Sequence, residues 1–290
     1  MKKINLRKWL NYLGSIIALL SIVFVAHRIT KYWAQIPDGT FTLKLFLIII
    51  LLAGAYGAAN FILAAAWKIL MVGLHQHISH RVATRIYGMT QLAKYVPGNI
   101  FQFAGRQLLT MSYGFSGKAI AKSTFLELLL LIITGAIYIF WMLPLLYPGF
   151  SVVYGLSLFI VTIVGLVLGL EWQGKGNLIK VVIKYLLFLF ISGGVFLCVL
   201  YSIVDNWVVT PVLIFPLIGA YVISWLVGLV TPGSPAGVGV REFLLILFLK
   251  PLFTEVDIIM AVVLGRVVTI IGDCFFYLYS FSLRQDDYYE

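Results

Sequence analysis

Long uninterrupted apolar runs restrict the fold of this chain more than any other feature. They lie near residues 10–29, 43–66, 124–147, 150–170, 181–203, 211–230 and 257–283, and a shorter run covers 240–253. A helix needs about 20 apolar residues to cross a bilayer. With 62% hydrophobic and 11% charged residues, the composition is far from that of soluble domains. The sequence predicts an all-α, polytopic transmembrane helix bundle of about seven or eight spans, one integral-membrane domain over residues 1–290.

The positive charges follow the pattern of a multispan membrane protein. Fourteen Lys and Arg residues gather in the segments 1–9, 67–123 and 171–184, and the formal net charge is +10. The positive-inside rule predicts that these segments and both termini lie in the cytoplasm. The segment 27–44, with three positive residues, conflicts with this topology. A basic excess on so apolar a chain indicates membrane loops and not nucleic-acid binding.

Two apolar stretches are interrupted by Pro-Gly. They cover residues 91–106, with Pro97-Gly98, and residues 230–242, with Pro232-Gly233. Proline removes a backbone donor and glycine accepts strained angles. Broken backbone at membrane depth persists only where protein or a water-filled cavity shelters it. Both stretches are therefore predicted to be re-entrant or interfacial elements.

The two broken stretches also match each other in spacing. In each, an arginine (Arg106 or Arg241) follows the proline by nine residues, and the two motifs are 135 residues apart. This favours an internal repeat with halves 1–147 and 181–283 joined by the span 150–170, although coincidence is the alternative. Because four predicted spans separate the motifs, both are expected to face the same side, as in a parallel repeat.

The two arginines are the first candidates for a functional site. Each follows a break where a helix begins, and free N–H groups together with a guanidinium can hold a phosphate or carboxylate. With the nearby polar residues, the candidate substrate-binding set consists of Lys94, Asn99, Gln102, Arg106, Arg241 and Glu242. The alternative is that the arginines are cytoplasmic loop residues that obey the positive-inside rule.

Three further charged residues lie within predicted spans, namely Glu127, Arg266 and Asp273. Arg266 and Asp273 are seven residues apart and share one helix face with small residues, so either can pair with another helix. Glu127 can pair with Arg106 or Arg241, or it can reach the interface as a snorkelling carboxylate. Structural ion pairs and a role in substrate or proton coupling both remain open.

Few residues are suited to catalysis. The sequence has only 11 carboxylates and lacks paired loop carboxylates, a nucleophile–histidine arrangement and a P-loop. His75, His77 and His80 have no nearby Cys, Asp or Glu to complete a metal site. We therefore expect no enzymatic activity, no cofactor and no metal.

The broken stretches resemble the hallmark segments of a known family. The residues that carry the resemblance are Lys94-Tyr95-Val96-Pro97-Gly98 with Gly105-Arg106, and Pro232-Gly233 with Gly237-Val238-Gly239-Val240-Arg241-Glu242. They are similar to those of the lysylphosphatidylglycerol synthase transmembrane, or flippase-like, family, best known as the membrane part of the bacterial multiple peptide resistance factor. The sequence departs from that family in two respects. Its 290 residues include no soluble synthase domain, so aminoacyl transfer is not expected, and Ser234-Pro235-Ala236 lies in a run that is often richer in glycine.

The resemblance implies a lipid-handling domain of the bacterial inner membrane that acts in cell-envelope biogenesis. The expected function is a lipid translocase, or a translocation accessory, for an anionic phospholipid or a polyprenyl-phosphate-linked sugar. One alternative is a non-catalytic membrane partner of an envelope glycosyltransferase or lipid-modifying enzyme. Another is an integral-membrane transferase that uses Glu127 or Asp273.

Overall fold

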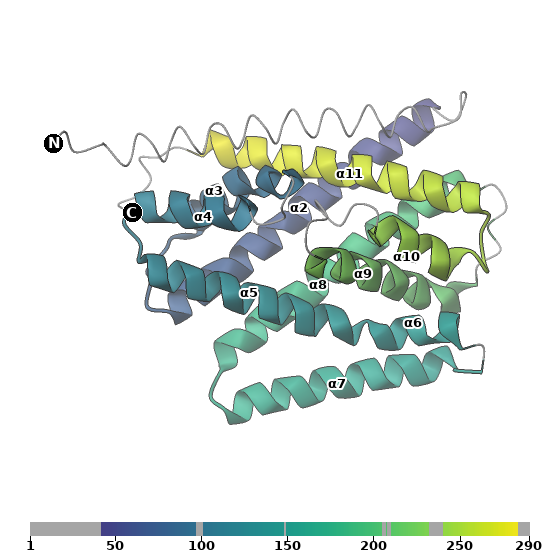
Figure 1. The fold of residues 1–290 in the computed structure, drawn as a ribbon, viewed down its shortest axis with the longest axis horizontal. Coiled ribbons are helices and arrows are strands. Elements are labelled where there is room, and N and C mark those ends of the chain that lie inside the picture. The colour runs from purple at the N-terminus through teal and green to yellow at the C-terminus, as the bar shows by residue number, and fades with distance from the viewer. Residues whose placement is uncertain are drawn as a thin grey trace.

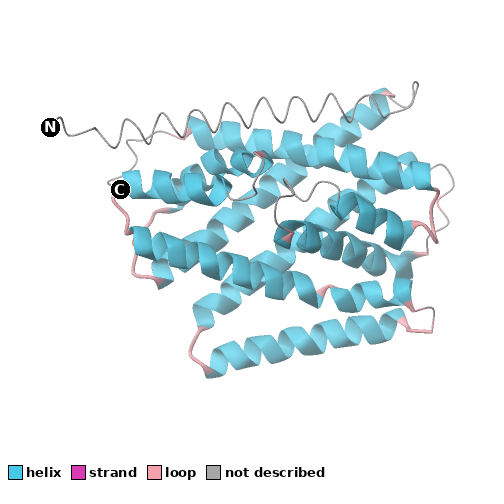
Figure 2. Cartoon of the chain, in the orientation of Figure 1, coloured by secondary structure: helices cyan, strands magenta, loops and turns pink. Residues whose placement is uncertain are grey.

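The described part of the chain is helical. The computed structural model describes residues 42–96, 101–147, 149–204, 207, 210–231 and 240–283, and these contain no strand (Figure 2). The elements are α2 (Leu43–Gly73), α3 (His80–Gln91), η1 (Leu92–Tyr95), α4 (Phe101–Ser112), α5 (Gly117–Ile137), α6 (Ile139–Leu146), α7 (Val152–Trp172), α8 (Gly176–Ile203), η2 (Pro211–Leu213), α9 (Ile214–Val230), α10 (Val240–Leu249) and α11 (Glu255–Ser282). The all-α prediction is confirmed.

Six of these helical segments are long and apolar enough to cross a membrane. They are α2, α5 with α6, α7, α8, η2 with α9, and α11. The helices α3, α4 and α10 have only 12, 12 and 10 residues. Ten helical residues rise about 15 Å, half the thickness of the hydrocarbon core, so α10 is too short to be one of the candidate spans. The span predicted at 10–29 lies outside the described residues.

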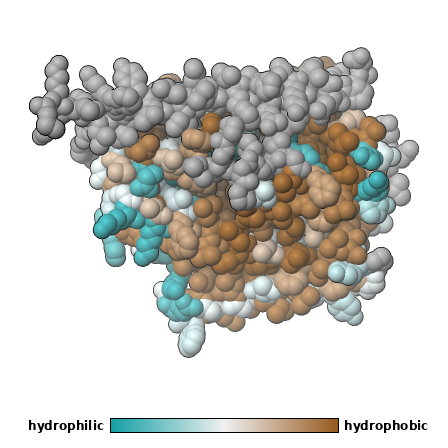
Figure 3. Space-filling view, in the orientation of Figure 1, coloured by the Kyte–Doolittle hydropathy of each residue, from teal (hydrophilic) through white to brown (hydrophobic). Residues whose placement is uncertain are grey.

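The distribution of apolar side chains fits a membrane environment. In the view of Figure 3, apolar residues cover the middle of the molecule and polar residues gather at its two ends. Among the six candidate spans, α7 is the least buried, with only 11% of its most apolar window inside the protein. A multi-pass membrane protein follows from these helices.

The centre of the bundle is formed by α2, α8 and α11, which contact one another (Figure 1). Where α2 crosses α11, two glycines let the backbones approach. A Cβ atom added to Gly272 would lie 2.6 Å from the carbonyl oxygen of Ala53, and one added to Gly57 would lie 2.7 Å from the carbonyl oxygen of Gly272. The small-residue face predicted for the last long helix is thus a site of close helix packing.

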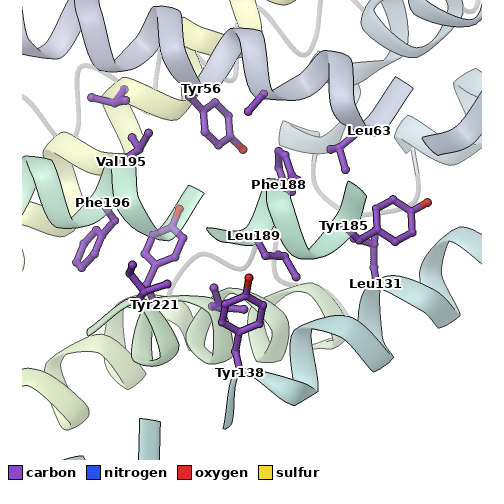
Figure 4. Packing of buried hydrophobic residues seen from close by; sticks show 14 of the residues in the cluster. Tyr56, Leu63, Leu131, Tyr138, Tyr185, Phe188, Leu189, Val195, Phe196 and Tyr221 are labelled. Atoms are coloured by element: carbon purple, nitrogen blue, oxygen red, sulfur yellow. The ribbon is translucent and has the colours of Figure 1, made fainter. Parts of the chain in front are cut away.

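Aromatic side chains fill the space around α8 (Figure 4). The ring centres of Phe196 and Tyr221 lie 4.9 Å apart in a stacked arrangement. The Tyr138 hydroxyl donates a hydrogen bond of 2.7 Å to the carbonyl oxygen of Leu186. These contacts fix α5, α6 and α9 against α8 and so hold the walls of the bundle interior in place.

The order of helices repeats along the chain. When 135 is added to the residue numbers, α2, α3, α4 and α5 fall on or beside α8, α9, α10 and α11. In each set a long helix is followed by a packed helix pair, α3 with α4 or α9 with α10, and then by another long helix. The helices of the two sets therefore correspond at the same 135-residue offset as the two Pro-Gly motifs.

The two packed pairs lie toward opposite ends of the bundle, an arrangement that differs from the parallel one expected from the sequence. Figure 1 shows α3 and α4 at the end where α2 finishes, and α9 and α10 at the other end, where α8 finishes. The parallel expectation counted residues 211–230 as a full crossing. In the structure α9 packs against the short helix α10 and both lie toward the same end of the molecule.

Candidate functional site

A cavity of about 90 Å³ lies inside the bundle, between both helix pairs. This volume is several times the roughly 10–15 Å³ that one water molecule needs. The charged residues that line it are Lys94, Arg106, Glu127, Arg241 and Arg266. Gln102, also predicted for the site, lines the cavity as well. Residues from opposite halves of the sequence therefore line one partly open cavity.

Arg106 of α4 forms an ion pair with Glu127 of α5 inside the bundle. Its Nη1 lies 2.5 Å from Glu127 Oε2, and only 1% of Arg106 is exposed. Tyr87 donates a hydrogen bond of 2.8 Å to Glu127 Oε1, and its ring centre lies 3.9 Å from the Arg106 guanidinium carbon. Of the two partners that the sequence offered for Glu127, the structure selects Arg106.

Not every hydrogen-bond donor of the Arg106 guanidinium is paired within the described residues. Within the described residues its Nε is buried and has no hydrogen-bond partner. Thr110 holds the helix locally by donating a hydrogen bond of 2.6 Å to the Arg106 carbonyl oxygen. An unsatisfied buried donor costs about 1–3 kcal/mol, so this N–H favours a ligand that can accept a hydrogen bond.

Asp273 of α11 is the centre of a second polar cluster. Its Oδ2 lies 2.7 Å from Lys94 Nζ and accepts a hydrogen bond of 2.5 Å from the Tyr95 hydroxyl. Its Oδ1 accepts one of 3.1 Å from Asn60 Nδ2 and one of 3.4 Å from Gln91 Nε2. Asp273 is fully buried, so this cluster ties α2, α3 and η1 to α11 at the wall of the cavity.

Arg266 and Glu242 form the third ion pair. Arg266 Nε and Nη2 each lie 2.9 Å from Glu242 Oε1, which joins α11 to α10. Arg266 lines the cavity, whereas Glu242, which was predicted for the site, is not among the lining residues and is connected to the cavity by its ion pair with Arg266. Arg266 and Asp273 thus both face the interior, as their shared helix face predicts, but they pair with different elements.

Arg241, the second residue of α10, is only 5% exposed. Its guanidinium carbon lies 4.4 Å from the ring centre of Tyr221 on α9. Among the residues that the structure describes, no carboxylate pairs with it. Within the described ranges, Arg241 is therefore the cavity arginine whose positive charge is not balanced by a neighbouring acid.

Several contributors to the site were missed at the level of the sequence. They are Asn60, Tyr87, Gln91, Tyr95 and Tyr221, which hold the charged residues in place. A signal existed for Asn60, because it is the sole amide in the apolar helix α2. Asn99 and both Pro-Gly motifs lie outside the described residues.

Comparisons with known proteins add no relative. No family model matches the chain, and no curated protein matches it. The resemblance to the lysylphosphatidylglycerol synthase transmembrane family therefore stays a prediction that rests on the quoted motifs.

Proposed function

We propose that the protein moves, or helps to move, a lipid with an anionic headgroup between the leaflets of a bilayer. The observation that carries the proposal is the set of four cations, Lys94, Arg106, Arg241 and Arg266, around one cavity in an apolar bundle. Unbalanced charge at membrane depth is costly. A phosphate-bearing headgroup would balance the positive charge of Arg241 and accept a hydrogen bond from Arg106 Nε.

In this proposal the helix pairs are re-entrant. The helices α4 and α10 have lengths of about 18 and 15 Å, which suffices to reach the middle of a 30 Å core and no farther. Lys94, just before the first Pro-Gly motif, and Arg241, just after the second, both line the cavity. The substrate site would then lie where the two re-entrant pairs meet, one from each side.

Such an arrangement offers a route for translocation. The segments α2–α5 and α8–α11 would form an inverted repeat, and transporters built in this way bind substrate at the repeat interface near the midplane. Movement of one helix pair would open the cavity toward one leaflet while the other pair keeps it closed. The headgroup would cross in the cavity while its chains stay in the lipid.

The charges at the two ends favour one orientation. The end where α2 finishes carries or adjoins eight Lys and Arg residues: Lys68, Arg81, Arg85, Lys118, Lys122, Lys175, Lys180 and Lys184. Of the residues that the structure describes, the opposite end has Lys44 and Lys250. By the positive-inside rule, the first end faces the cytoplasm of the bacterial inner membrane.

The alternatives receive less support. A transferase would need an acid or base free to exchange protons, but Glu127, Glu242 and Asp273 are each paired with a cation. A non-catalytic partner of a glycosyltransferase would not need the cations inside the cavity. Tolerance of Arg241→Gln together with co-purification of such an enzyme would favour this partner role.

Leaflet exchange in vesicles tests the proposal. The full chain is reconstituted into vesicles, and the loss of a fluorescent short-chain phosphatidylglycerol from the outer leaflet is followed over time. We expect the protein to accelerate exchange and Arg241→Gln to slow it at least about tenfold, equivalent to 1.4 kcal/mol. Lys250→Gln, which removes an exposed cation just after the same helix, is the matched control and should exchange like the natural chain. No acceleration of phosphatidylglycerol or polyprenyl-phosphate-linked sugar would refute the translocase proposal.

A further inference from the structure

The charged residues that line the cavity, together with the acids paired to them, form one cluster whose net charge can be counted. The cations Lys94, Arg106, Arg241 and Arg266 line it, and so does Glu127. Two more acids, Asp273 and Glu242, are paired directly with lining cations. Four positive and three negative charges give the cluster a net charge of +1.

Residues 97–100 and 232–239, which carry the Pro-Gly motifs and lie outside the described ranges, add no charge to this count. Residues 97–100 are Pro-Gly-Asn-Ile, and residues 232–239 contain only Pro, Gly, Ser, Ala and Val. None of these side chains ionises between pH 5 and 9. Within the described part of the chain, the charge balance of the cluster therefore depends on the seven residues already named.

We infer that the cavity selects a headgroup that carries one phosphodiester and no other ionised group. This inference rests on the proposed function and specifies the substrate class. A single negative charge brings the buried cluster to neutrality, whereas a diphosphate turns it negative. A zwitterionic headgroup leaves the positive charge unbalanced and brings an ammonium group near four cations.

The donor geometry supports the same class of ligand. Arg106 contributes a buried Nε without a partner, and Arg241 contributes a guanidinium without a carboxylate in the described part of the chain. Lys94 and Arg266 are already bonded to Asp273 and Glu242. Two arginines thus remain to hold the non-bridging oxygens of one phosphate, and guanidinium groups suit that geometry.

Two kinds of lipid carry this headgroup chemistry. Phosphatidylglycerol has one phosphodiester on acyl chains, and a hexose linked to a polyprenyl monophosphate has one on a prenyl chain. The probes that differ in charge are a polyprenyl-diphosphate-linked hexose and phosphatidylcholine. The affinities of all four lipids for the full chain in detergent micelles are measured by displacement of fluorescent phosphatidylglycerol.

For the natural chain we expect both phosphodiester probes to bind at least about tenfold more tightly than the diphosphate and than phosphatidylcholine. If only one phosphodiester probe binds tightly, its chain identifies the lipid source and the inference stands. If the diphosphate binds as tightly as phosphatidylglycerol, the inference is wrong and the proposed function remains. If phosphatidylcholine binds as tightly as phosphatidylglycerol, both the inference and the preference for an anionic headgroup are wrong. If none of the four lipids binds, both are wrong.

A change of cluster charge gives the second test. Glu242→Gln raises the net charge to +2 and should shift the affinity ratio about tenfold toward the diphosphate. Glu127→Gln makes the same change in charge at a different ion pair, so one of the two variants suffices if the other fails to fold. Arg241→Gln brings the cluster to zero and should reduce the affinity for phosphatidylglycerol to that for phosphatidylcholine. An unchanged ratio in folded Glu242→Gln or Glu127→Gln protein would overturn the inference.

Discussion

The buried pair of Arg106 and Glu127 allows stability and function to be separated. We predict that Arg106→Met and Glu127→Leu each destabilise the protein strongly, and that the double variant restores most of the loss. Each single change leaves an uncompensated charge in the interior, whereas the double change leaves two apolar side chains. Because Arg106 lines the cavity, the double variant should fold and still lose transport.

The magnitude follows from burial. The two side chains expose only 1% and 2% of their surface, and Arg106 Nη1 lies 2.5 Å from Glu127 Oε2. Breaking such a pair by removing one partner costs about 3–5 kcal/mol, while replacing both with apolar groups is about neutral. The double variant should therefore be at least about 3 kcal/mol more stable than either single variant.

The free energy of unfolding in mild detergent micelles, obtained from denaturant titration, measures these differences. The exposed pair of Lys250 and Glu255, 3.6 Å apart, serves as the matched control. Lys250→Met and Glu255→Leu should each change stability by less than about 1 kcal/mol and should be additive. Additive losses for Arg106→Met and Glu127→Leu would refute the view that the two form one buried unit.

Three further predictions concern packing, the cavity and topology. Gly272→Ala should lower the free energy of unfolding in detergent by about 1–3 kcal/mol, because the added Cβ would meet the Ala53 carbonyl oxygen. Gly54→Ala is the control and should not destabilise the protein, because the space around Gly54 is open. Arg241→Gln should lower the free energy of unfolding by less than Arg106→Met does, because no described carboxylate is left behind; equal losses would contradict this ranking. Cysteines are placed one at a time at Thr210 and Lys250 in a chain whose Cys198 and Cys274 are replaced by alanine. Both should react with an impermeant label from the same side of the membrane, because α9 and α10 lie toward one end of the bundle. Labelling from opposite sides would show that residues 211–230 cross the membrane fully.

The long helices were predictable because length and hydropathy determine them directly. The spans expected at 43–66, 150–170 and 181–203 correspond to α2, α7 and α8. The direction of the second helix pair was not predictable, because residues 211–230 are as long and as apolar as a full span. Only packing against α10 reveals which end of the bundle this segment occupies.

The charged residues of the site were predictable individually and their partners only in part. Arg106 and Glu127 are 21 positions apart on neighbouring helices, so their pairing could be proposed from the sequence. Asp273 meets Tyr95 and Asn60 from 178 and 213 positions away, and no local spacing encodes such contacts. The convergence of both arginines on one cavity likewise depends on how the two halves pack.

The central claim is that the cavity holds an anionic lipid headgroup. The most direct measurement is a cryo-electron microscopy map of the full chain in nanodiscs that contain phosphatidylglycerol. The claim predicts phosphate density in the cavity, within hydrogen-bond distance of Arg106 Nε and the Arg241 guanidinium, which is lost in Arg241→Gln. A map in which water alone fills the cavity, with lipid phosphates confined to the two membrane surfaces, would contradict it.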